Sequence, residues 1–206
     1  MIKRKILPSI CYEFLCEDGL LKQTIEQVQK LEWEYNRTNC KSIQNINCID
    51  EFQPLMSWFQ TCVDKVKNDL NLPFDELVIT QAWANRSFYN EWHQPHTHAN
   101  SFLSAVFYLT TSSSGLTWFS RQNEWLDFFL LKPKENEKPV NRNIVHKELP
   151  ISGKLFLFPS NLVHSVEEHF GSSARYTISF NTFPGGEIEK DGFLRYLNIK
   201  VIPAKN

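Results

Sequence analysis

The sequence predicts a mainly β protein with helices at its N-terminus, in which an antiparallel sandwich or barrel of the jelly-roll kind is backed by two α-helices. Three observations support this prediction. Helical periodicity is confined to the first third of the chain, short β-branched and aromatic runs follow from about Leu77, and no helical pattern interrupts these runs. A chain of 206 residues, 42% of them hydrophobic, can bury one sizeable core.

Two amphipathic helices are expected in the first third. Residues 18–35 and residues 52–70 both carry apolar side chains at three- and four-residue steps, the spacing that gives a helix one hydrophobic face. Asp50 is the expected N-cap of the second helix, and Asn71 and Pro73 are expected to end it.

Seven runs are expected to form strands, because they combine β-branched and aromatic residues and are separated by turn residues. The runs are LVITQAW, SFLSAVFYL, GLTWFS, WLDFFLL, IVHKEL, GKLFLFP and RYTISFNTF. Residues 132–143, KPKENEKPVNRN, form a charged, proline-containing insertion that cannot enter a core. This insertion is therefore either a solvated connection or a lid over a site.

The chain is expected to form a single domain over residues 1–206, because it contains neither a repeat nor a Gly/Ser-rich linker. Residues 1–75 are predicted to be a helical support, residues 76–184 the jelly-roll core, and residues 185–206 a C-terminal extension.

The composition gives no sign of a large charged partner or of a membrane. The net charge is −1, which leaves no broad surface for nucleic acid or anionic lipid. No apolar run is long enough to span a bilayer, and Pro8 interrupts the N-terminal apolar stretch that a signal peptide would need. The five cysteines include no CxxC pair, so reduced thiols in the cytoplasm are the simplest interpretation.

The stretch EWHQPHTHANSFLSAVFYL, residues 91–109, places three histidines just before an expected strand. Side chains alternate along a strand, so His96 and His98 are expected to share a face, and this parity continues along the strand if no bulge intervenes. The later residues of this parity are Asn100, Phe102, Ser104, Val106 and Tyr108, and those of the opposite parity, expected to face a core, are Leu103, Ala105, Phe107 and Leu109. The strand is therefore expected to line a polar pocket.

Two imidazoles at this spacing suit Fe, Zn, Cu or Ni, although HTH alone is better explained by a surface loop with two solvated histidines. A third candidate ligand comes from GKLFLFPSNLVHSV, in which His164 follows a turn and enters the next strand. In a closed barrel, His164 can face His96 and His98 from across the pocket.

The run RYTISFN adds a cation to this pocket. Alternation places Arg175, Thr177, Ser179 and Asn181 on one face of the strand. A buried arginine is costly unless it is paired, so Arg175 needs either a protein carboxylate or a small anionic ligand that its guanidinium can hold at two points. The coincidence of three histidines with a buried cation favours the ligand.

The remaining histidines have simpler interpretations. His93 is expected to be a loop histidine near Trp92, with a place close to the metal or the substrate as the alternative. His146 and His169 have no partners at a useful spacing and are expected at the surface. Trp83 and Asn85 precede the cluster and are candidates for the border of a substrate opening, although packing is the expected role of Trp83.

The order H-x-H, a strand ending in FYL, and then LFLFP…H…RYTISFN resembles the oxygenases that depend on Fe(II) and 2-oxoglutarate, and more narrowly a branch of that superfamily found in bacteria and tailed phages. The resemblance spans roughly residues 77–184. It implies a double-stranded β-helix of the cupin-like kind. It also implies an oxidoreductase, a dioxygenase that uses Fe(II), 2-oxoglutarate and O2 and usually gives a hydroxylated product.

Carried over by position, the resemblance makes His96, His98 and His164 the iron ligands. Most of the superfamily has Asp or Glu where this chain has His98, in a facial triad of two histidines and one carboxylate. Either the site holds three histidines, or an acid such as Glu91 takes part, and zinc or nickel then becomes harder to exclude.

The resemblance also makes Arg175 the residue that binds the distal carboxylate of 2-oxoglutarate. Thr177 lies where the family often has a hydroxyl, and Tyr108 lies where several relatives place a tyrosine on the same carboxylate. Asn100 and Asn181 are further candidates for the pocket.

Two other functions are compatible with these residues. One is a cupin-type enzyme that uses three histidines without 2-oxoglutarate, such as a dioxygenase or a hydrolytic zinc enzyme. The other is a non-enzymatic jelly roll, such as a virion or carbohydrate-binding module. For the oxygenase, the substrate can be a protein side chain, a nucleobase or a metabolite, and the near-neutral charge disfavours a large nucleic-acid duplex. The pattern does not select an oligomeric state.

Overall fold

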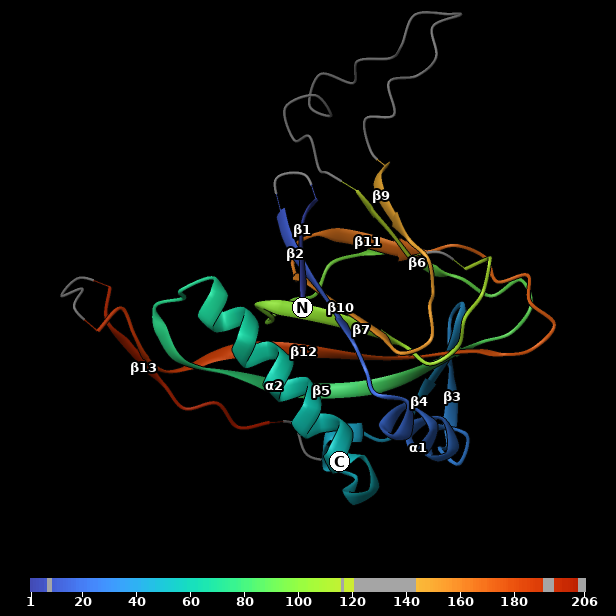
Figure 1. Ribbon diagram of the computed structural model, residues 1–206, viewed down its shortest axis with the longest axis horizontal. Coiled ribbons are helices and arrows are strands. Elements are labelled where there is room, and N and C mark those ends of the chain that lie inside the picture. The colour runs from blue at the N-terminus through green and yellow to red at the C-terminus, as the bar shows by residue number, and fades with distance from the viewer. Residues whose placement is uncertain (7–8, 116, 121–143, 191–194, 204–206) are drawn as a thin grey trace, which may run out of the picture.

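The structure is a computed structural model, and it describes residues 1–6, 9–115, 117–120, 144–190 and 195–203. Two antiparallel sheets face each other, and the helices lie on the outer side of the larger sheet (Figure 1). The predicted mainly β jelly roll backed by two helices is therefore confirmed. The expected strand WLDFFLL and the insertion over residues 132–143 lie outside the described residues.

Among the described residues, the larger sheet has nine strands and the smaller sheet has four. In spatial order the strands of the larger sheet are β1 (Ile2–Ile6), β2 (Ser9–Leu15), β10 (Lys154–Pro159), β7 (Leu103–Tyr108), β12 (Arg175–Ile188), β5 (Phe74–Ser87), β4 (Asn39–Ser42) and β3 (Trp33–Asn36), with β13 (Leu197–Ile199) pairing β12. The strands of the smaller sheet lie in the order β6 (His93–His96), β11 (Val163–Val166), β8 (Thr117–Ser120) and β9 (Ile144–Glu148).

Two α-helices and two short 3-10 helices complete the described fold. They are α1 (Asp18–Val28), η1 (Ile46–Cys48), η2 (Asp50–Phe52) and α2 (Gln53–Asp69). The first helix is shorter than predicted, because Trp33 enters an edge hairpin and its ring packs against Tyr176 with centroids 5.8 Å apart. Asp50 is not the N-cap of α2, since it begins η2 and the last residue of η2 precedes α2 without a side-chain cap. The predicted end of α2 is confirmed by Asn71, whose φ of 48° is left-handed.

The first 75 residues contain four strands that the sequence analysis did not predict. β1 and β2 form a hairpin, and β2 continues the large sheet by pairing with β10. In β2, Cys11 and Tyr12 are both buried although they point to opposite faces, which hides the alternation that marks a half-exposed strand. The predicted division into a support, a core and a C-terminal extension stays a prediction.

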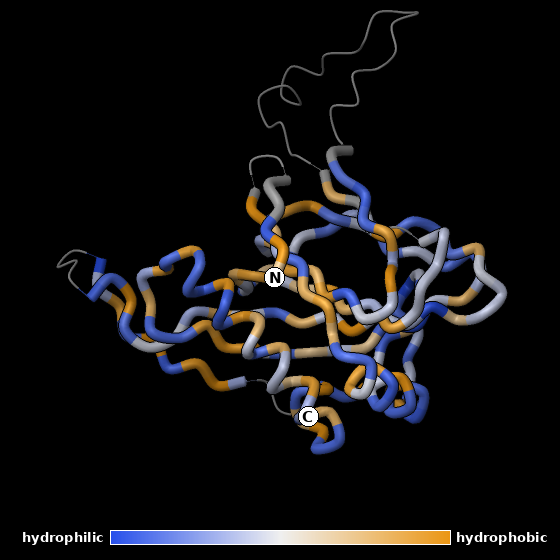
Figure 2. Tube along the Cα trace, in the orientation of Figure 1, coloured by the Kyte–Doolittle hydropathy of each residue, from blue (hydrophilic) through white to orange (hydrophobic). Residues whose placement is uncertain are grey.

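The large sheet separates two apolar layers, and hydrophobic residues recur along its strands (Figure 2). Its outer face packs on α2, and the buried residues there include Leu103, Ala105, Phe107 and Leu109 of β7 and the loop after it. Its inner face carries Val106 and Tyr108, which pack with Cys11, Phe119, Phe156 and Phe158 between the sheets. The predicted parity of residues 103–109 is confirmed.

A buried ion pair next to this inner layer links the two sheets. Lys154 Nζ of β10 lies 2.8 Å from Glu148 Oε2 of β9, and both side chains are less than 5% exposed. His146 adds a contact of 2.5 Å from its Nε2 to Glu148 Oε1. The attraction between the two opposite charges offsets part of the free-energy cost of removing each from water.

The aromatic cluster under α2 should dominate stability. Phe59 is fully buried, and its ring centroid lies 5.3 Å from that of Phe107 and 4.8 Å from that of Phe180. We expect Phe59→Ala to lower the free energy of unfolding by about 3–5 kcal/mol, measured by urea denaturation, because it leaves a cavity. Tyr35→Ala, at a side chain 67% exposed, should change it by less than about 0.5 kcal/mol. A similar small loss for Phe59→Ala would contradict this assignment of the core.

Among the described residues, no helix is both long enough and apolar enough to cross a membrane.

Candidate metal centre

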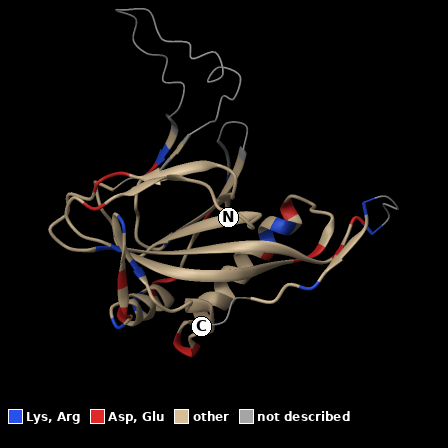
Figure 3. Ribbon diagram, turned by 180° about the vertical axis from the view of Figure 1, so that it is seen from behind, with Lys and Arg blue, Asp and Glu red and all other residues tan. Residues whose placement is uncertain are grey.

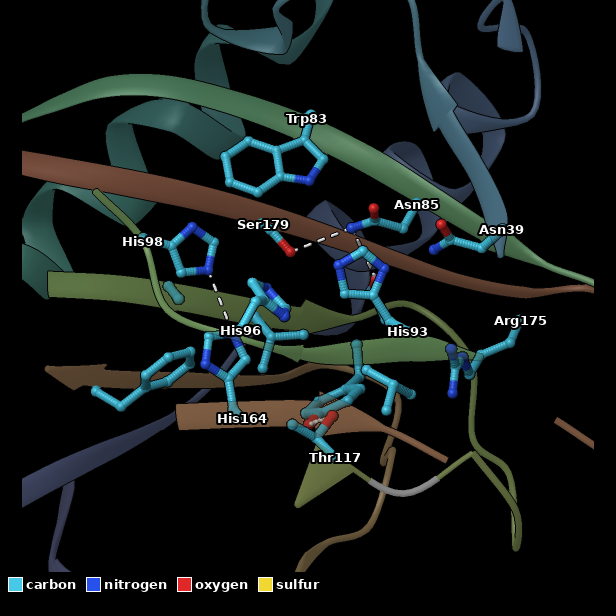
Figure 4. A pocket seen from close by; sticks show the side chains of 16 residues that line it. Asn39, Trp83, Asn85, His93, His96, His98, Thr117, His164, Arg175 and Ser179 are labelled. Atoms are coloured by element: carbon cyan, nitrogen blue, oxygen red, sulfur yellow. Dashed lines mark hydrogen bonds between the residues drawn. The ribbon is translucent and has the colours of Figure 1, made fainter. Parts of the chain in front are cut away.

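A pocket lies between the two sheets and brings together six of the residues singled out in the sequence (Figure 4). The large sheet contributes side chains from β4, β5, β7, β10 and β12, and the small sheet contributes them from β6, β8 and β11. The predicted site residues that line the pocket are Tyr108, His96, His98, His164, Arg175 and Thr177.

Three imidazoles meet at one end of the pocket. His96 and His164 are opposite each other in the β6–β11 pair, and their ring centroids are 4.2 Å apart. His98 follows the end of β6, and its backbone N–H donates to the carbonyl of Ser160 at 3.0 Å, which holds this turn against the β10–β11 connection. The ring of His98 lies 5.0 Å from that of His96. The two histidines of HTH therefore converge, but across a strand end rather than on one continuous strand.

The ring nitrogens are oriented for a cation. His96 Nδ1 donates to the carbonyl of Gln94 at 2.8 Å, and His164 Nδ1 donates to that of Leu162 at 2.9 Å. Because a carbonyl only accepts, each neutral ring keeps its lone pair on Nε2, the usual arrangement of a metal-binding histidine. Backbone carbonyls thus fix the orientation of two of the three rings.

The spacing of the nitrogens also suits a metal. His98 Nε2 and His164 Nε2 are 3.2 Å apart, and one ligand atom from each of the three histidines lies within 4.8 Å of the others. With metal–nitrogen bonds of about 2.1 Å, adjacent ligands are about 3.0 Å apart around an octahedral ion and about 3.4 Å apart around a tetrahedral one. The measured separation falls between these values.

Burial keeps these histidines uncharged. Loss of water contacts lowers the pKa of His98 to about 4, with neighbouring His96 a smaller cause, and lowers the pKa values of His96 and His164 as well. A histidine that is neutral at pH 7 can bind a cation without first losing a proton.

Glu91, the alternative acid, is not brought to this group. Its Oε2 accepts a hydrogen bond from the backbone N–H of Phe88 at 2.8 Å. Among the described residues, the metal-binding cluster consists of the three histidines alone. The geometry therefore favours His98 over Glu91 as the third candidate ligand.

Arg175 closes the other end of the pocket and is only 5% exposed. Its Nη1 donates to the carbonyl of Gly115 and its Nη2 to Ser87 Oγ, whereas its buried Nε has no partner. Burial lowers the pKa of Arg175 to about 10, so the side chain still carries its charge at pH 7. No described carboxylate forms an ion pair with it, although a buried charge ordinarily requires one.

Hydroxyl and amide groups lie next to Arg175. Thr177 faces Tyr108 across the β7–β12 pair, and both line the pocket. The phenol of Tyr108 donates to Thr117 Oγ1 at 2.8 Å. Asn85 Nδ2 donates to Ser179 Oγ at 3.2 Å and more weakly to Thr177 Oγ1 at 3.4 Å. This end of the pocket therefore combines a cation with hydrogen-bonding groups.

Four predicted pocket residues lie outside it: Asn100, Phe102, Ser104 and Asn181. Asn100 is exposed at a turn with φ of 52°, and Phe102 after it packs against Phe74, because the chain between β6 and β7 is not extended. Asn181 is buried and accepts a hydrogen bond from Ser104 at 2.8 Å, and it borders an adjoining groove instead.

Two further histidines differ from their expected places. His93 lines the pocket, and its buried Nδ1 has no partner, because an irregularity in the β6–β11 pairing places it opposite Val166. Burial lowers the pKa of His93 to about 4. The prediction of a surface position is wrong for His169, which is 3% exposed and bonds through Nε2 to the carbonyl of Ser173.

One known sequence family matches the part of the chain that carries these residues. The sequence family described as "Putative 2OG-Fe(II) oxygenase" matches residues 81–181, a segment that includes the three histidines and Arg175. None of the curated proteins compared with the chain matches it.

Several solved structures share the fold at low identity. HygX from Streptomyces hygroscopicus, solved with nickel and 2-oxoglutarate bound, is 13% identical with a TM-score of 0.64, over 93% of this chain and 92% of that one. A prolyl-4-hydroxylase from Pseudomonas putida is 12% identical with a TM-score of 0.59, over 85% and 93%. A prolyl hydroxylase from Trichoplax adhaerens is 16% identical with a TM-score of 0.57, over 84% and 83%.

At these identities the solved structures establish the shared fold, and the match of the sequence family adds the chemistry. The match covers the strands that form the pocket, and its description names both Fe(II) and 2-oxoglutarate, the cofactors predicted from the sequence. Over residues 81–181 the chain therefore matches the oxygenases that use Fe(II) and 2-oxoglutarate.

Proposed function

We propose that the protein is a hydroxylase in which His96, His98 and His164 bind Fe(II) and Arg175 anchors 2-oxoglutarate. One observation carries this proposal: a cluster of three imidazoles and a buried guanidinium without a carboxylate partner line the same pocket. Three protein ligands leave positions on the ion for a chelating cosubstrate and for O2. When bound, Fe(II) would activate O2 with electrons drawn from 2-oxoglutarate.

The roles of the residues around Arg175 follow from their hydrogen bonds. Contacts to Gly115 and Ser87 use two of the five N–H donors of the guanidinium, and they hold its plane in place. The other donors can bind a carboxylate at two points, the geometry that a guanidinium matches best. Thr177 supplies a hydroxyl beside it, and the phenol of Tyr108 would turn from Thr117 toward the same carboxylate.

The proposed overall reaction balances. One atom of O2 is inserted into a C–H bond of the substrate to give C–OH, and the other enters succinate as 2-oxoglutarate loses CO2. Each of the two oxidations supplies two electrons, which together reduce O2. The chain contributes orientation and a partly apolar wall, including Val106 and Phe158, that excludes water from the metal.

Anaerobic titration tests this proposal. Protein loaded with Fe(II) should develop a weak metal-to-ligand absorption band in the visible region when 2-oxoglutarate is added, and admitting O2 should then form succinate. Zinc or nickel in place of iron should bind but give neither signal. Iron demonstrably bound without the band would contradict the proposal.

The family match removes the basis for a three-histidine enzyme that does not use 2-oxoglutarate and for a non-enzymatic jelly roll. It leaves the substrate open, since one relative is solved with hygromycin B and another with a peptide fragment of hypoxia inducible factor. A cytoplasmic location is part of this proposal and is supported by the lack of a CxxC pair among the five cysteines. The link to bacterial or phage relatives stays a prediction.

A further inference from the structure

A groove opens beside the metal centre, on the side of the β3–β4 hairpin. Its wall shares five residues with the pocket: Trp83, Asn85, His93, His96 and His98. A molecule in this groove would therefore reach the metal centre without passing Arg175, which does not line the groove.

The floor of the groove belongs to a polar stripe on the inner face of β5 and β12. Four cross-strand pairs follow one another along it: Ser87 with Arg175, Asn85 with Thr177, Trp83 with Ser179, and Gln81 with Asn181. The stripe thus runs from a buried cation, past the histidines, to a pair of amides. One end selects an anion, and the other end offers only uncharged hydrogen-bonding groups.

The far end of the groove carries almost no charge. Its uncharged polar residues are Asn36, Ser42, Gln44, Asn45, Gln81 and Asn181. Among the described residues that line it, the one charged side chain is Lys41, whose Nζ pairs with Glu34 at 2.8 Å. A neighbouring surface cavity is lined instead by Glu167 and Glu168. In Figure 3, charged residues gather at the ends of the large sheet and on the helices, and its middle is largely free of them.

Two buried polar atoms that line the adjoining metal pocket lack partners. Asn39 is 2% exposed and His93 is partly buried, and Asn39 Oδ1 and His93 Nδ1 make no hydrogen bond (Figure 4). Unpaired buried polar atoms are costly, so a site that retains them is suited to a ligand that satisfies them. An amide and an imidazole both donate and accept, and a hydroxyl or an amide group complements them.

We propose that this groove binds the primary substrate, and that the substrate is an uncharged small molecule rich in hydroxyl or amide groups. The assignment rests on the proposed function, because a molecule in this groove is a substrate only if the adjacent metal centre activates O2 as proposed. The indole of Trp83, whose ring lies 5.9 Å from that of His98, provides a flat apolar surface beside the metal. The polar body of the substrate would bind the amides of Gln44 and Gln81, and a group that reaches into the pocket would meet Asn39.

Calorimetric titration of anaerobic protein saturated with Fe(II) and 2-oxoglutarate tests this assignment, because the cosubstrate then occupies the Arg175 end. The probes are two matched pairs: methyl glucoside with glucuronate, and N-acetyl-asparagine amide with N-acetyl-aspartate amide. We expect the neutral member of at least one pair to bind at least about tenfold more tightly than its carboxylate partner. The two pairs distinguish a hydroxyl-rich from an amide-rich substrate.

Gln44→Ala and Gln81→Ala should each weaken that binding by about tenfold, the loss of one or two hydrogen bonds. Gln23→Ala, on the exposed surface of α1, is the matched control and should change nothing. The assignment is overturned if the carboxylate probes bind as tightly as the neutral ones, if no probe binds at high concentration, or if the groove variants behave like the control. The visible band of the loaded protein, recorded first, shows separately whether the proposed function has failed.

Discussion

Replacing His164 with alanine is expected to abolish metal binding and, with it, succinate formation. His164 lies at the centre of the cluster, opposite His96 in the strand pair and with its Nε2 3.2 Å from that of His98. Loss of a group that merely supports a metal ligand lowers affinity or activity by about 10- to 100-fold, so loss of a ligand should cost more than about 100-fold. Elemental analysis of untagged protein and succinate assays measure the two effects.

His146→Ala is the control for a lost imidazole, because that ring contacts Glu148 and lies outside the cluster. It should retain the metal. Retention of the metal by His164→Ala would remove the three-histidine site from consideration.

A second pair of variants tests His98, the proposed third ligand. His98→Ala should lose the metal, whereas His98→Asp should recover part of the iron affinity, because a carboxylate at this position completes the common set of two histidines and one acid. If both variants bind iron as the parent chain does, His98 is not a ligand. This comparison separates a ligand from a side chain that only fills space, since alanine and aspartate both remove the ring.

The sequence predicts the parts of this fold in which one face is buried and the other is not. Residues 103–109 alternate between the two apolar layers as their pattern requires, and α2 keeps its period from end to end. The β1–β2 hairpin escapes prediction because burial of both faces of β2 erases the alternation. The predicted first helix, residues 18–35, runs past the end of α1 for a related reason: a few apolar residues at helical spacing continue into an edge hairpin.

At the site, residue type predicts more than strand parity does. The three histidines and Arg175 line one pocket, as their chemistry suggests, but the chain between His98 and β7 turns with a positive φ at Asn100. Strand alternation counted through that turn therefore places Asn100 and Phe102 in the pocket, where they do not lie. The place of His93 depends on an irregular pairing of β6 with β11, which no local pattern signals.

Arg175→Ala is expected to raise the half-saturating concentration of 2-oxoglutarate by between about 30-fold and 4000-fold, while metal binding is retained. The range corresponds to about 2–5 kcal/mol, the usual cost of removing one partner of a buried, hydrogen-bonded charge pair. Arg175→Lys keeps the charge but loses the planar fork, so it should recover only part of the affinity. Titration of the visible band gives the affinity, and elemental analysis gives the metal content.

Gly115→Ala tests the same contact without altering the arginine. A Cβ at Gly115 would lie 2.1 Å from Arg175 Nη1, so the guanidinium must move, and the residue's φ of 67° adds strain for alanine. We expect weaker 2-oxoglutarate binding with the charge still present. Gly19→Ala, where the new Cβ meets nothing within 4 Å, is the matched control. If Arg175→Ala and Gly115→Ala both leave 2-oxoglutarate affinity unchanged in metal-loaded protein, the cosubstrate binds elsewhere, because the buried guanidinium would then have no part in holding it.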